Sequence, residues 1–336
     1  MIRLVQIGNV SARRVALVAE PHLLCLTGVE SVYELVLACL SEGASLSERA
    51  HALASGESLF YDDVYAGKSE WRLLSPIDVA GTPERVLVSG TGLTHLGSAK
   101  DRQAMHAQAD AQKPVTDSMR MFELGIAGGR PKVGEIGAAP EWFFKGHGGI
   151  LQHPSEPLTV PAHAEDGGEE AEIAGIYVIA NDGTPHRVGM CAGNEFSDHR
   201  FERHNYLNLA GSKLRQCSIG PELVVGADFR SVAGEVSIER DGMTFWKKQI
   251  ETGEENMSHS LANLEHHHFK FEGHRTPGSV HVHFFGAHSL SFGEGIELKD
   301  GDWMQVKFEG FGRALRNPVH IEDKKFNRPF RVQPLG

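Results

Sequence analysis

The order of apolar and polar positions divides the chain into two regions, and the first of them ends near residue 85. Residues 2–7 and 14–18 alternate apolar and polar side chains, which is typical of short strands. Residues 31–54 instead place apolar side chains three and four positions apart, so we predict one or two helices there. Together these patterns predict a small N-terminal α/β domain over residues 1–85.

The next region changes from strand to helix. Residues 86–88 are an apolar run that leads into a glycine loop at residues 89–93. No strand–helix–strand unit with a downstream acidic residue follows, so the dinucleotide-binding fingerprint is not met. Residues 98–124 have the composition of helices interrupted at Pro114. Ser98 and Thr116 are the expected N-caps of these helices.

From about Pro140 onward, short alternating segments recur between Gly and Pro residues, and one helix near residues 255–269 interrupts them. The predicted strands cover residues 172–179, 187–192, 223–225, 236–240, 280–285 and 303–308. An irregular series of strands with few helices predicts a β-rich α+β domain over residues 86–336, without regular strand–helix alternation.

Composition narrows the possible partners. The 336 residues carry a formal net charge of −11 and no block of Lys and Arg, which disfavours nucleic acid and anionic membranes as partners. The four cysteines are scattered, so we expect reduced thiols and no disulfide framework. No secretory signal and no membrane-spanning apolar run is recognisable, and we expect a cytoplasmic protein.

The most informative polar positions are Glu170 and Glu172, which stand two apart at the entry to a predicted strand. Alternate strand residues share a face, so both carboxylates lie close together and repel unless one is protonated or a cation lies between them. Oxygen ligands without a nearby cysteine favour a hard divalent ion. An acidic strand edge is more often a solvated surface, so this pair needs support from other residues.

Two later segments add polar groups. Asn194 and Glu195 end an apolar strand, and Ser197 or Asp198 can start a helix directly afterwards. Lys213 precedes a tight Gly-Pro turn. A single lysine is usually exposed, so Lys213 is a candidate only in company with the acidic groups.

The 19 histidines suggest a second metal hypothesis. His281 and His283 would share one face of a strand and could bind Zn²⁺ or Fe²⁺, as in a cupin-like barrel. The Glu that a cupin places shortly after its second His is missing, and the adjacent residues 266–268 cannot all face one ion. We therefore expect these histidines to pack, cap or contact another subunit.

In this order the segments resemble the fumarylacetoacetate hydrolase superfamily, over roughly residues 86–320. The resemblance rests on five short elements: Trp142-Phe143-Phe144-Lys145, Glu170-x-Glu172, Asn194-Glu195, Lys213 before Gly220-Pro221, and Phe285-Gly286 followed by Gly301-Asp302. It implies a fumarylacetoacetate-hydrolase-like catalytic domain, a 2-keto acid substrate and a homodimer. It further implies Glu170, Glu172 and Glu195 as ligands of Mg²⁺ (or Mn²⁺ or Ca²⁺), with Lys145 and Lys213 lining the substrate site.

The chain departs from the family pattern at three places. Glu195 replaces the usual Asp, and Ser98 and Asp101 stand where the hydrolases carry a water-activating His and Glu. Ala287 replaces a Thr of the late loop. The remaining expected substrate contacts, besides Lys145, are Ser98, Gly286, His288 and Ser289.

The absent hydrolytic pair favours a dehydratase, and the signatures around residues 140–146, 193–199 and 263–270 resemble a sugar-acid branch of the superfamily. For that branch we expect dehydration of 2-dehydro-3-deoxy-L-arabinonate to 2,5-dioxopentanoate. Lys213 is the candidate base or electrostatic group, and His95 or His147 the candidate acid. A hydrolase that cleaves a C–C bond of an acylpyruvate, and a non-catalytic sugar-acid-binding protein, remain the alternatives.

Overall fold

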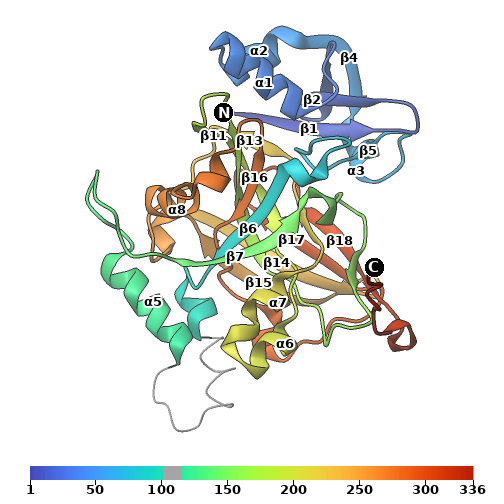
Figure 1. The fold of residues 1–336 in the computed structure, drawn as a ribbon. Helices are drawn as coiled ribbons and strands as arrows, with labels where there is room; N and C mark the ends of the chain where they lie inside the picture. Colours follow the sequence, from blue (N-terminus) through green and yellow to red (C-terminus); the bar gives the residue numbers. More distant parts are fainter. Residues whose placement is uncertain (101–115, 336) are drawn as a thin grey trace.

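A computed structural model describes residues 1–100 and 116–335. Figure 1 shows the N-terminal elements at one end of the molecule and the short helices α6 (His199–His204) and α7 (Leu209–Lys213) at the other. The described strands form two β-sheets, and the larger one includes the N-terminal strands. The fold-class prediction, a β-rich α+β protein with an N-terminal β/α region, is confirmed.

The larger sheet has 13 strands within the described residues. Its main path runs in the order β4 (Ala54–Phe60), β3 (His22–Leu26), β2 (Arg13–Ala19), β1 (Ile2–Gly8), β13 (Leu223–Val225), β11 (Pro185–Asn194), β10 (Ala171–Ile179), β16 (Val280–Phe284), β6 (Val86–Gly92) and β7 (Glu141–His147). Three short strands pair at its sides: β5 (Arg72–Leu73), β8 (Leu151–Gln152) and β12 (Cys217–Ile219). Most neighbours are antiparallel, and β16 and β6 run parallel.

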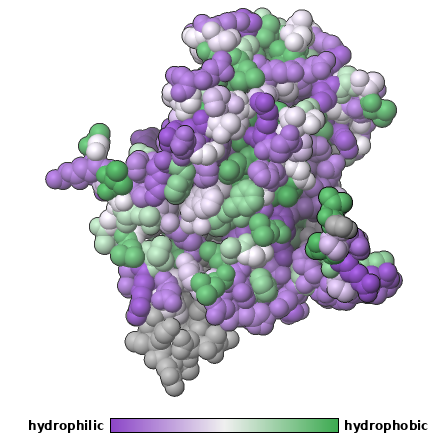
Figure 2. All heavy atoms as spheres, in the orientation of Figure 1, coloured by the Kyte–Doolittle hydropathy of each residue, from purple (hydrophilic) through white to green (hydrophobic). Residues whose placement is uncertain are grey.

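The smaller sheet has the order β15 (Met243–Thr252), β14 (Val232–Arg240), β17 (Trp303–Phe308), β18 (Leu315–Ile321) and β9 (Leu158–Val160). The remaining helices are α1 (Val32–Glu42), α2 (Leu46–Leu53), α3 (Tyr61–Tyr65), α5 (Asp117–Gly128) and α8 (Leu261–Phe269). None of the described helices is both long enough and apolar enough to cross a membrane. The face in Figure 2 is mostly polar, with its apolar residues in small scattered groups.

Strand β10 lies at the centre of the molecule, and all nine of its residues are buried. Since alternate side chains point to opposite faces, Ile176 joins one hydrophobic core and Tyr177 joins the other. The first core also contains Leu4 and Leu35 from the N-terminal region and Val282 from β16. The same apolar core therefore holds residues from both predicted domains.

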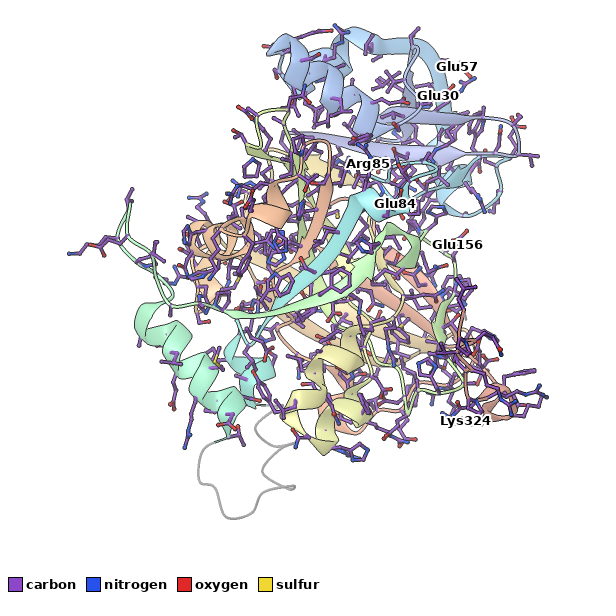
Figure 3. All side chains as sticks on the ribbon, viewed as in Figure 1. Glu30, Glu57, Glu84, Arg85, Glu156 and Lys324 are labelled. Atoms are coloured by element: carbon purple, nitrogen blue, oxygen red, sulfur yellow. The ribbon has the colours of Figure 1, made fainter. Side chains whose placement is uncertain are left out.

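The two predicted domains also share a sheet, because β1 pairs with β13. The boundary at residue 85 falls at the end of a single 3₁₀ turn, Pro83–Arg85, directly before β6. Glu84 and Arg85 are labelled at this junction in Figure 3. The division into residues 1–85 and 86–336 stays a prediction.

Glu222 connects the two regions by hydrogen bonds. Its carboxylate is fully buried and accepts from Arg3 Nη1 at 2.9 Å, Tyr61 Oη at 2.9 Å and the backbone N of Arg313 at 3.0 Å. Burial raises the pKa of Glu222, and the bond from the Arg313 backbone opposes this rise. The contacts join β1 and α3 to the segment after β17.

We expect Glu222→Ala to lower the free energy of unfolding by about 3 kcal/mol, since it leaves the buried hydroxyl of Tyr61 and one side of Arg3 without an acceptor. Urea unfolding measures the change. The exposed Glu255→Ala is the matched control and should change stability by less than about 0.5 kcal/mol. Equal stabilities of the two variants would contradict the structural role of Glu222.

Most predicted elements are confirmed within a few residues, and the deviations have local causes. Thr116 is the N-cap of α5 and accepts from Met119 N at 3.3 Å. Ser98 is not an N-cap, because helical residues begin at Leu96 and its hydroxyl donates to the carbonyl of His95. The predicted helix near residues 255–269 is shorter, since α8 starts at Leu261.

Strand β15 has no counterpart among the predicted strands. It exposes most of its side chains, Met243 and Phe245 included. A register shift in its pairing with β14, next to Trp246, interrupts the alternation that periodicity detects.

Candidate metal centre

Three glutamates meet because two strand segments run antiparallel in one register. In the β10–β11 pair, Glu172 lies opposite Gly193. The register continues before β10, where the backbone N of Glu195 donates to the carbonyl of Glu170 at 2.9 Å. Residues opposite each other point their side chains to the same face. Glu170 and Glu195 are therefore a cross-strand pair, and Glu172, two residues further on, shares their face.

These carboxylates are close and buried. One oxygen from each of the three glutamates lies within 4.8 Å of the other two, and none of the residues is more than 5% exposed. Burial raises the pKa of Glu172 well above its usual range, and the charges of Glu195 and Glu170 raise it further. Burial also raises the pKa of Glu195, against the lowering influence of Lys145 and Lys213.

Lys213 lies directly among the carboxylates. Its buried ammonium donates to Glu170 Oε1, to Glu195 Oε2 at 2.5 Å and to Ser197 Oγ at 3.0 Å. Its Nζ also lies 4.9 Å from the ring centre of Phe143. Two carboxylates therefore contact this one ammonium group. This environment suits an electrostatic role better than that of a neutral base.

Lys145, on β7, approaches Glu195 from the other side. Its Nζ lies 2.5 Å from Glu195 Oε1. It also lies 2.7–3.0 Å from the carbonyl oxygens of Glu195, Phe196 and Lys213. An ammonium group has three N–H donors, and these four acceptors already engage them. Lys145 therefore supports the strand end that carries Glu195, and substrate contact would require one of these bonds to break.

We expect Lys145→Met to lower the free energy of unfolding by about 3 kcal/mol or more, because it removes one countercharge from the buried Glu195 and one hydrogen-bond donor from each of three carbonyl groups. Urea unfolding is the measurement. The exposed Lys68→Met is the control and should stay within about 0.5 kcal/mol of wild type. A loss below about 1 kcal/mol for Lys145→Met would assign this lysine a weaker structural role.

Glu141 lies on the same face of β7 as Lys145, since residues 141, 143 and 145 are the buried positions of that strand. Tyr206 Oη donates to Glu141 Oε2 at 2.8 Å. The sequence interpretation left Glu141 out of the candidate site. The even spacing between Glu141 and Lys145 on a predicted strand is the signal that could have identified it.

The loop after β16 is held at both ends by the acidic segment. The backbone N of Gly286 donates to Glu172 Oε2 at 2.7 Å. Ser291 donates to Glu169 through its backbone N and its hydroxyl, both at 2.8 Å. Between these anchors lies Ser289, whose buried hydroxyl has no partner in the described part of the chain. Glu169, absent from the predicted site, thus fixes the loop that carries Ser289.

Gly286 is required by this arrangement. Its φ of +100° disfavours any other residue, and a Cβ there would overlap the hydroxyl of Thr94. Its amide donates to Glu172, and a role of Gly286 in binding substrate stays a prediction.

The other predicted residues for which hydrogen bonds are described make them to groups other than the three glutamates. Both ring nitrogens of His95 share hydrogen bonds with hydroxyls, those of Thr94 at 2.9 Å and Thr252 at 3.0 Å. Burial, with the charge of His288, lowers the pKa of His95 to about 3, so the imidazolium form that could act as an acid is not populated at neutral pH. Ser98 donates to the carbonyl of His95, which gives it a structural contact.

The late-loop and β7 histidines are likewise engaged elsewhere. His288 Nδ1 bonds to the carbonyl of Glu251 at 2.9 Å. His147 is exposed and lines a pocket with Arg85 and His281, which none of the three glutamates lines. The structure therefore gives no support to His147 as an acid. Asp101 lies outside the described residues.

The histidine-rich segments form a buried cluster away from the glutamates. His268 Nε2 and His281 Nδ1 are 2.9 Å apart, and His283 Nδ1 bonds to Ser89 Oγ at 2.8 Å. The rings of His268 and His283 lie 4.3 Å apart. In the described part of the chain, Glu170, Glu172 and Glu195 are the one group of three or more His, Cys, Asp or Glu residues placed to share an ion. The structure thus supports packing, as predicted, for these histidines.

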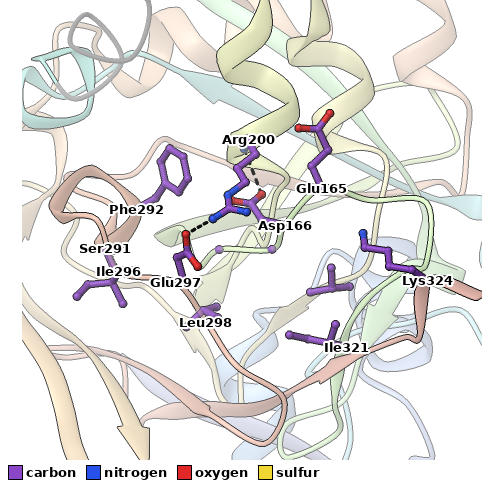
Figure 4. Close-up of a pocket in the computed structure, with 13 residues that line it drawn as sticks. Glu165, Asp166, Arg200, Ser291, Phe292, Ile296, Glu297, Leu298, Ile321 and Lys324 are labelled. Carbon is purple, nitrogen blue, oxygen red and sulfur yellow. Dashed lines mark hydrogen bonds and ion pairs between the residues drawn. The ribbon is translucent and has the colours of Figure 1, made fainter. Parts of the chain in front are cut away.

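A pocket of about 120 Å³ lies beside the glutamate cluster. Its apolar side includes Phe292 and Ile321, and its rim carries Asp166, Arg200 and Glu297 (Figure 4). Arg200 forms an ion pair with Glu297, and its backbone N donates to Asp166. Gly168, two residues before Glu170, lines this pocket, but none of the three glutamates does. The pocket is therefore separate from the glutamate cluster.

The donor set fits a hard divalent cation. Three carboxylates in a buried space offer oxygen ligands of the kind that Mg²⁺, Mn²⁺ and Ca²⁺ prefer. Burial raises the pKa of Glu172, and repulsion from the charges of Glu195 and Glu170 raises it further. A cation at Glu170, Glu172 and Glu195 would relieve that repulsion.

No protein-family model and no curated protein matches the sequence. Solved structures match it along nearly its whole length. The apo form of 2-keto-3-deoxy-D-arabinonate dehydratase has a TM-score of 0.71 at 17% identity, covering 96% of this chain and 100% of that one. The same dehydratase complexed with magnesium and 2,5-dioxopentanoate has a TM-score of 0.68 at 17% identity, with 95% and 99% covered.

A fumarylacetoacetate hydrolase from Exiguobacterium antarcticum has a TM-score of 0.60 at 17% identity, covering 96% of this chain and 100% of that one. At such identities the likeness concerns the fold. The chain therefore has the fold that these dehydratases share with fumarylacetoacetate hydrolase, as its sequence motifs predict.

Proposed function

We propose that this chain is a divalent-metal-dependent dehydratase of a 2-keto-3-deoxy sugar acid. The reaction would convert 2-dehydro-3-deoxy-L-arabinonate to 2,5-dioxopentanoate and water. The observation that supports this most directly is the buried cluster of Glu170, Glu172 and Glu195 with two lysines against it. The likeness in fold to dehydratases, one of them complexed with magnesium and 2,5-dioxopentanoate, adds support.

The charge of the cluster suits an anionic substrate. When all three carboxylates are ionised, their charges and those of the two ammonium groups of Lys145 and Lys213 sum to −1, and a divalent cation would change that sum to +1. A 2-keto acid carries one carboxylate, so its binding would bring the sum to zero. Such a cation would supply Lewis-acid polarisation of the keto group.

The proposed dehydration requires a proton to leave C3 of the sugar acid and a hydroxyl group to leave C4. Together they form the water that is released. Proton shifts then turn C5 into an aldehyde. Lys213, which donates to Glu170 and Glu195, would stabilise negative charge on the substrate. Glu141 is the candidate for proton transfer, since its buried carboxyl faces the same side of β7 as Phe143, against which Lys213 packs.

An assay with both C4 epimers of 2-dehydro-3-deoxy-arabinonate tests the proposal. Loss of the C4 hydroxyl removes the stereocentre, so both epimers would give the same product, and their separate rates would identify the preferred one. We expect 2,5-dioxopentanoate to form with Mg²⁺ and not after treatment with EDTA. Turnover that persists without metal would overturn the proposal.

Acylpyruvates are the second substrate class for the assay, because the fold is shared with a fumarylacetoacetate hydrolase. Their cleavage to pyruvate and a carboxylic acid, without dehydration of either epimer, would establish the hydrolase. Metal binding with no turnover of any 2-keto acid would favour a non-catalytic binding protein. The expected homodimer is tested separately, by light scattering on the purified chain.

A further inference from the structure

His199 is held at a fixed place behind the glutamate cluster. It is the first residue of α6, whose N-cap Asp198 accepts from Phe201 N at 3.0 Å. Asp198 also accepts from Arg215 Nη2 at 3.0 Å, and its backbone N donates to the carbonyl of Ser212 at 3.1 Å. These bonds fix the start of α6, and therefore the origin of the His199 side chain.

The ring of His199 occupies space that Gly168 leaves open. Gly168 and Ser197 pair in the same antiparallel register that brings Glu170 opposite Glu195, with both backbone hydrogen bonds at 2.9–3.0 Å. Gly168 therefore belongs to the face that carries Glu170. A Cβ on Gly168 would overlap Nδ1 and Cε1 of His199, so the ring can reach past this position only because it is glycine.

From this position His199 contacts the glutamate cluster. Its Nε2 shares a hydrogen bond of 3.1 Å with Glu170 Oε1, and the residue is 1% exposed. Phe292 closes another side of the ring, with the two ring centres 5.2 Å apart. Phe292 and Gly168 both line the adjacent pocket shown in Figure 4. Gly168 and Phe292 therefore both help to set the position of the ring.

We propose that His199, whose ring packs against Gly168, is a positioning residue that orients the carboxylate of Glu170 toward the bound cation. The inference rests on the proposed metal site and deepens it. A hydrogen bond from behind fixes the rotamer of a metal ligand, so the ligand loses less conformational entropy when the ion binds. Losing such a supporting bond typically weakens metal affinity by about 10–100-fold.

Calorimetric titration of EDTA-stripped protein with Mg²⁺ tests the inference with two independent changes to one contact. His199→Phe keeps a ring but removes the hydrogen bond, and Gly168→Ala keeps His199 but displaces its ring. Both should weaken Mg²⁺ binding by about 10–100-fold. His199→Gln retains an N–H donor and should recover part of the affinity. Gly149→Ala is the matched glycine control, since a Cβ there meets nothing within 4 Å.

Melting curves in EDTA separate positioning from general destabilisation. His199→Gln should melt near the wild-type temperature in EDTA and bind Mg²⁺ more tightly than His199→Phe. Equal Mg²⁺ affinity in wild type, His199→Phe and Gly168→Ala would overturn the positioning role while leaving the metal site intact. If the wild-type chain itself binds no Mg²⁺, the proposed function fails first.

Discussion

Glu172→Gln is expected to bind Mg²⁺ at least about 100-fold more weakly than the wild-type chain. Losing a charged metal ligand should lower the affinity at least as much as losing a hydrogen bond that supports such a ligand. Turnover of the sugar acid should fall by a similar factor or more. The side chain keeps its length, and its amide oxygen can still accept from the backbone N of Gly286. Calorimetry and the dehydration assay measure the two effects.

The same change should stabilise the metal-free protein. Burial, together with the charges of Glu195 and Glu170, raises the pKa of Glu172 well above the value of an unfolded chain. A carboxyl whose folded pKa is raised opposes folding at every pH where the unfolded chain is ionised, so a side chain that cannot ionise removes this cost. We therefore expect Glu172→Gln to melt at a higher temperature than wild type in EDTA.

The exposed Glu309→Gln is the control for both measurements and should change neither. Unaltered Mg²⁺ affinity in Glu172→Gln would sink the metal site. A lower melting temperature of Glu172→Gln in EDTA would show that the three carboxylates do not repel one another in the folded chain.

Acidification from pH 7 to pH 5 is expected to lower the free energy of unfolding by about 4 kcal/mol through His281 and His283, about 2 kcal/mol each. Burial, with the charges of neighbouring histidines, lowers the pKa of both residues to about 3. Below pH 6.5 the unfolded chain binds a proton at each histidine and the folded chain does not, so stability falls as the pH falls and the loss levels off near pH 3. His95 adds a contribution of the same sign.

Urea unfolding at pH 7, 6 and 5 measures this loss. His283→Gln removes one titrating group, so its stability should fall by about 2 kcal/mol less than that of wild type over this range. The exposed His163→Gln is the control. An identical pH dependence in His283→Gln and wild type would show that His283 is protonated in the folded chain. Stabilisation by added Zn²⁺ would instead revive the cupin-like hypothesis.

The candidate site could be predicted in part. Strand period two correctly placed Glu170 and Glu172 on one face, because that geometry depends only on the backbone. That Glu195 lies opposite Glu170 depends on the β10–β11 register, which spacing alone does not set. The resemblance to a known family supplied that third residue, and the structure places it in the cluster.

The sequence is less informative about residues whose surroundings come from distant segments. Lys145 and His95 have residue types suited to substrate chemistry, yet the chain itself uses the polar atoms of both. Glu169, Glu141 and His199 were overlooked because their partners lie 29 or more residues away along the chain. No local pattern marks such contacts.

Strand periodicity, helix caps such as Thr116 and the closeness of Glu170 to Glu172 are readable from the amino-acid order, since each depends on neighbours a few residues apart. The tertiary structure alone decided which carboxylates face a common space, how Lys145 and Lys213 contact them, and which histidines have a lowered pKa. Those outcomes depend on burial and on charges brought together from distant parts of the chain. Desolvation and Coulomb interactions act through space, and only the folded arrangement sets those distances.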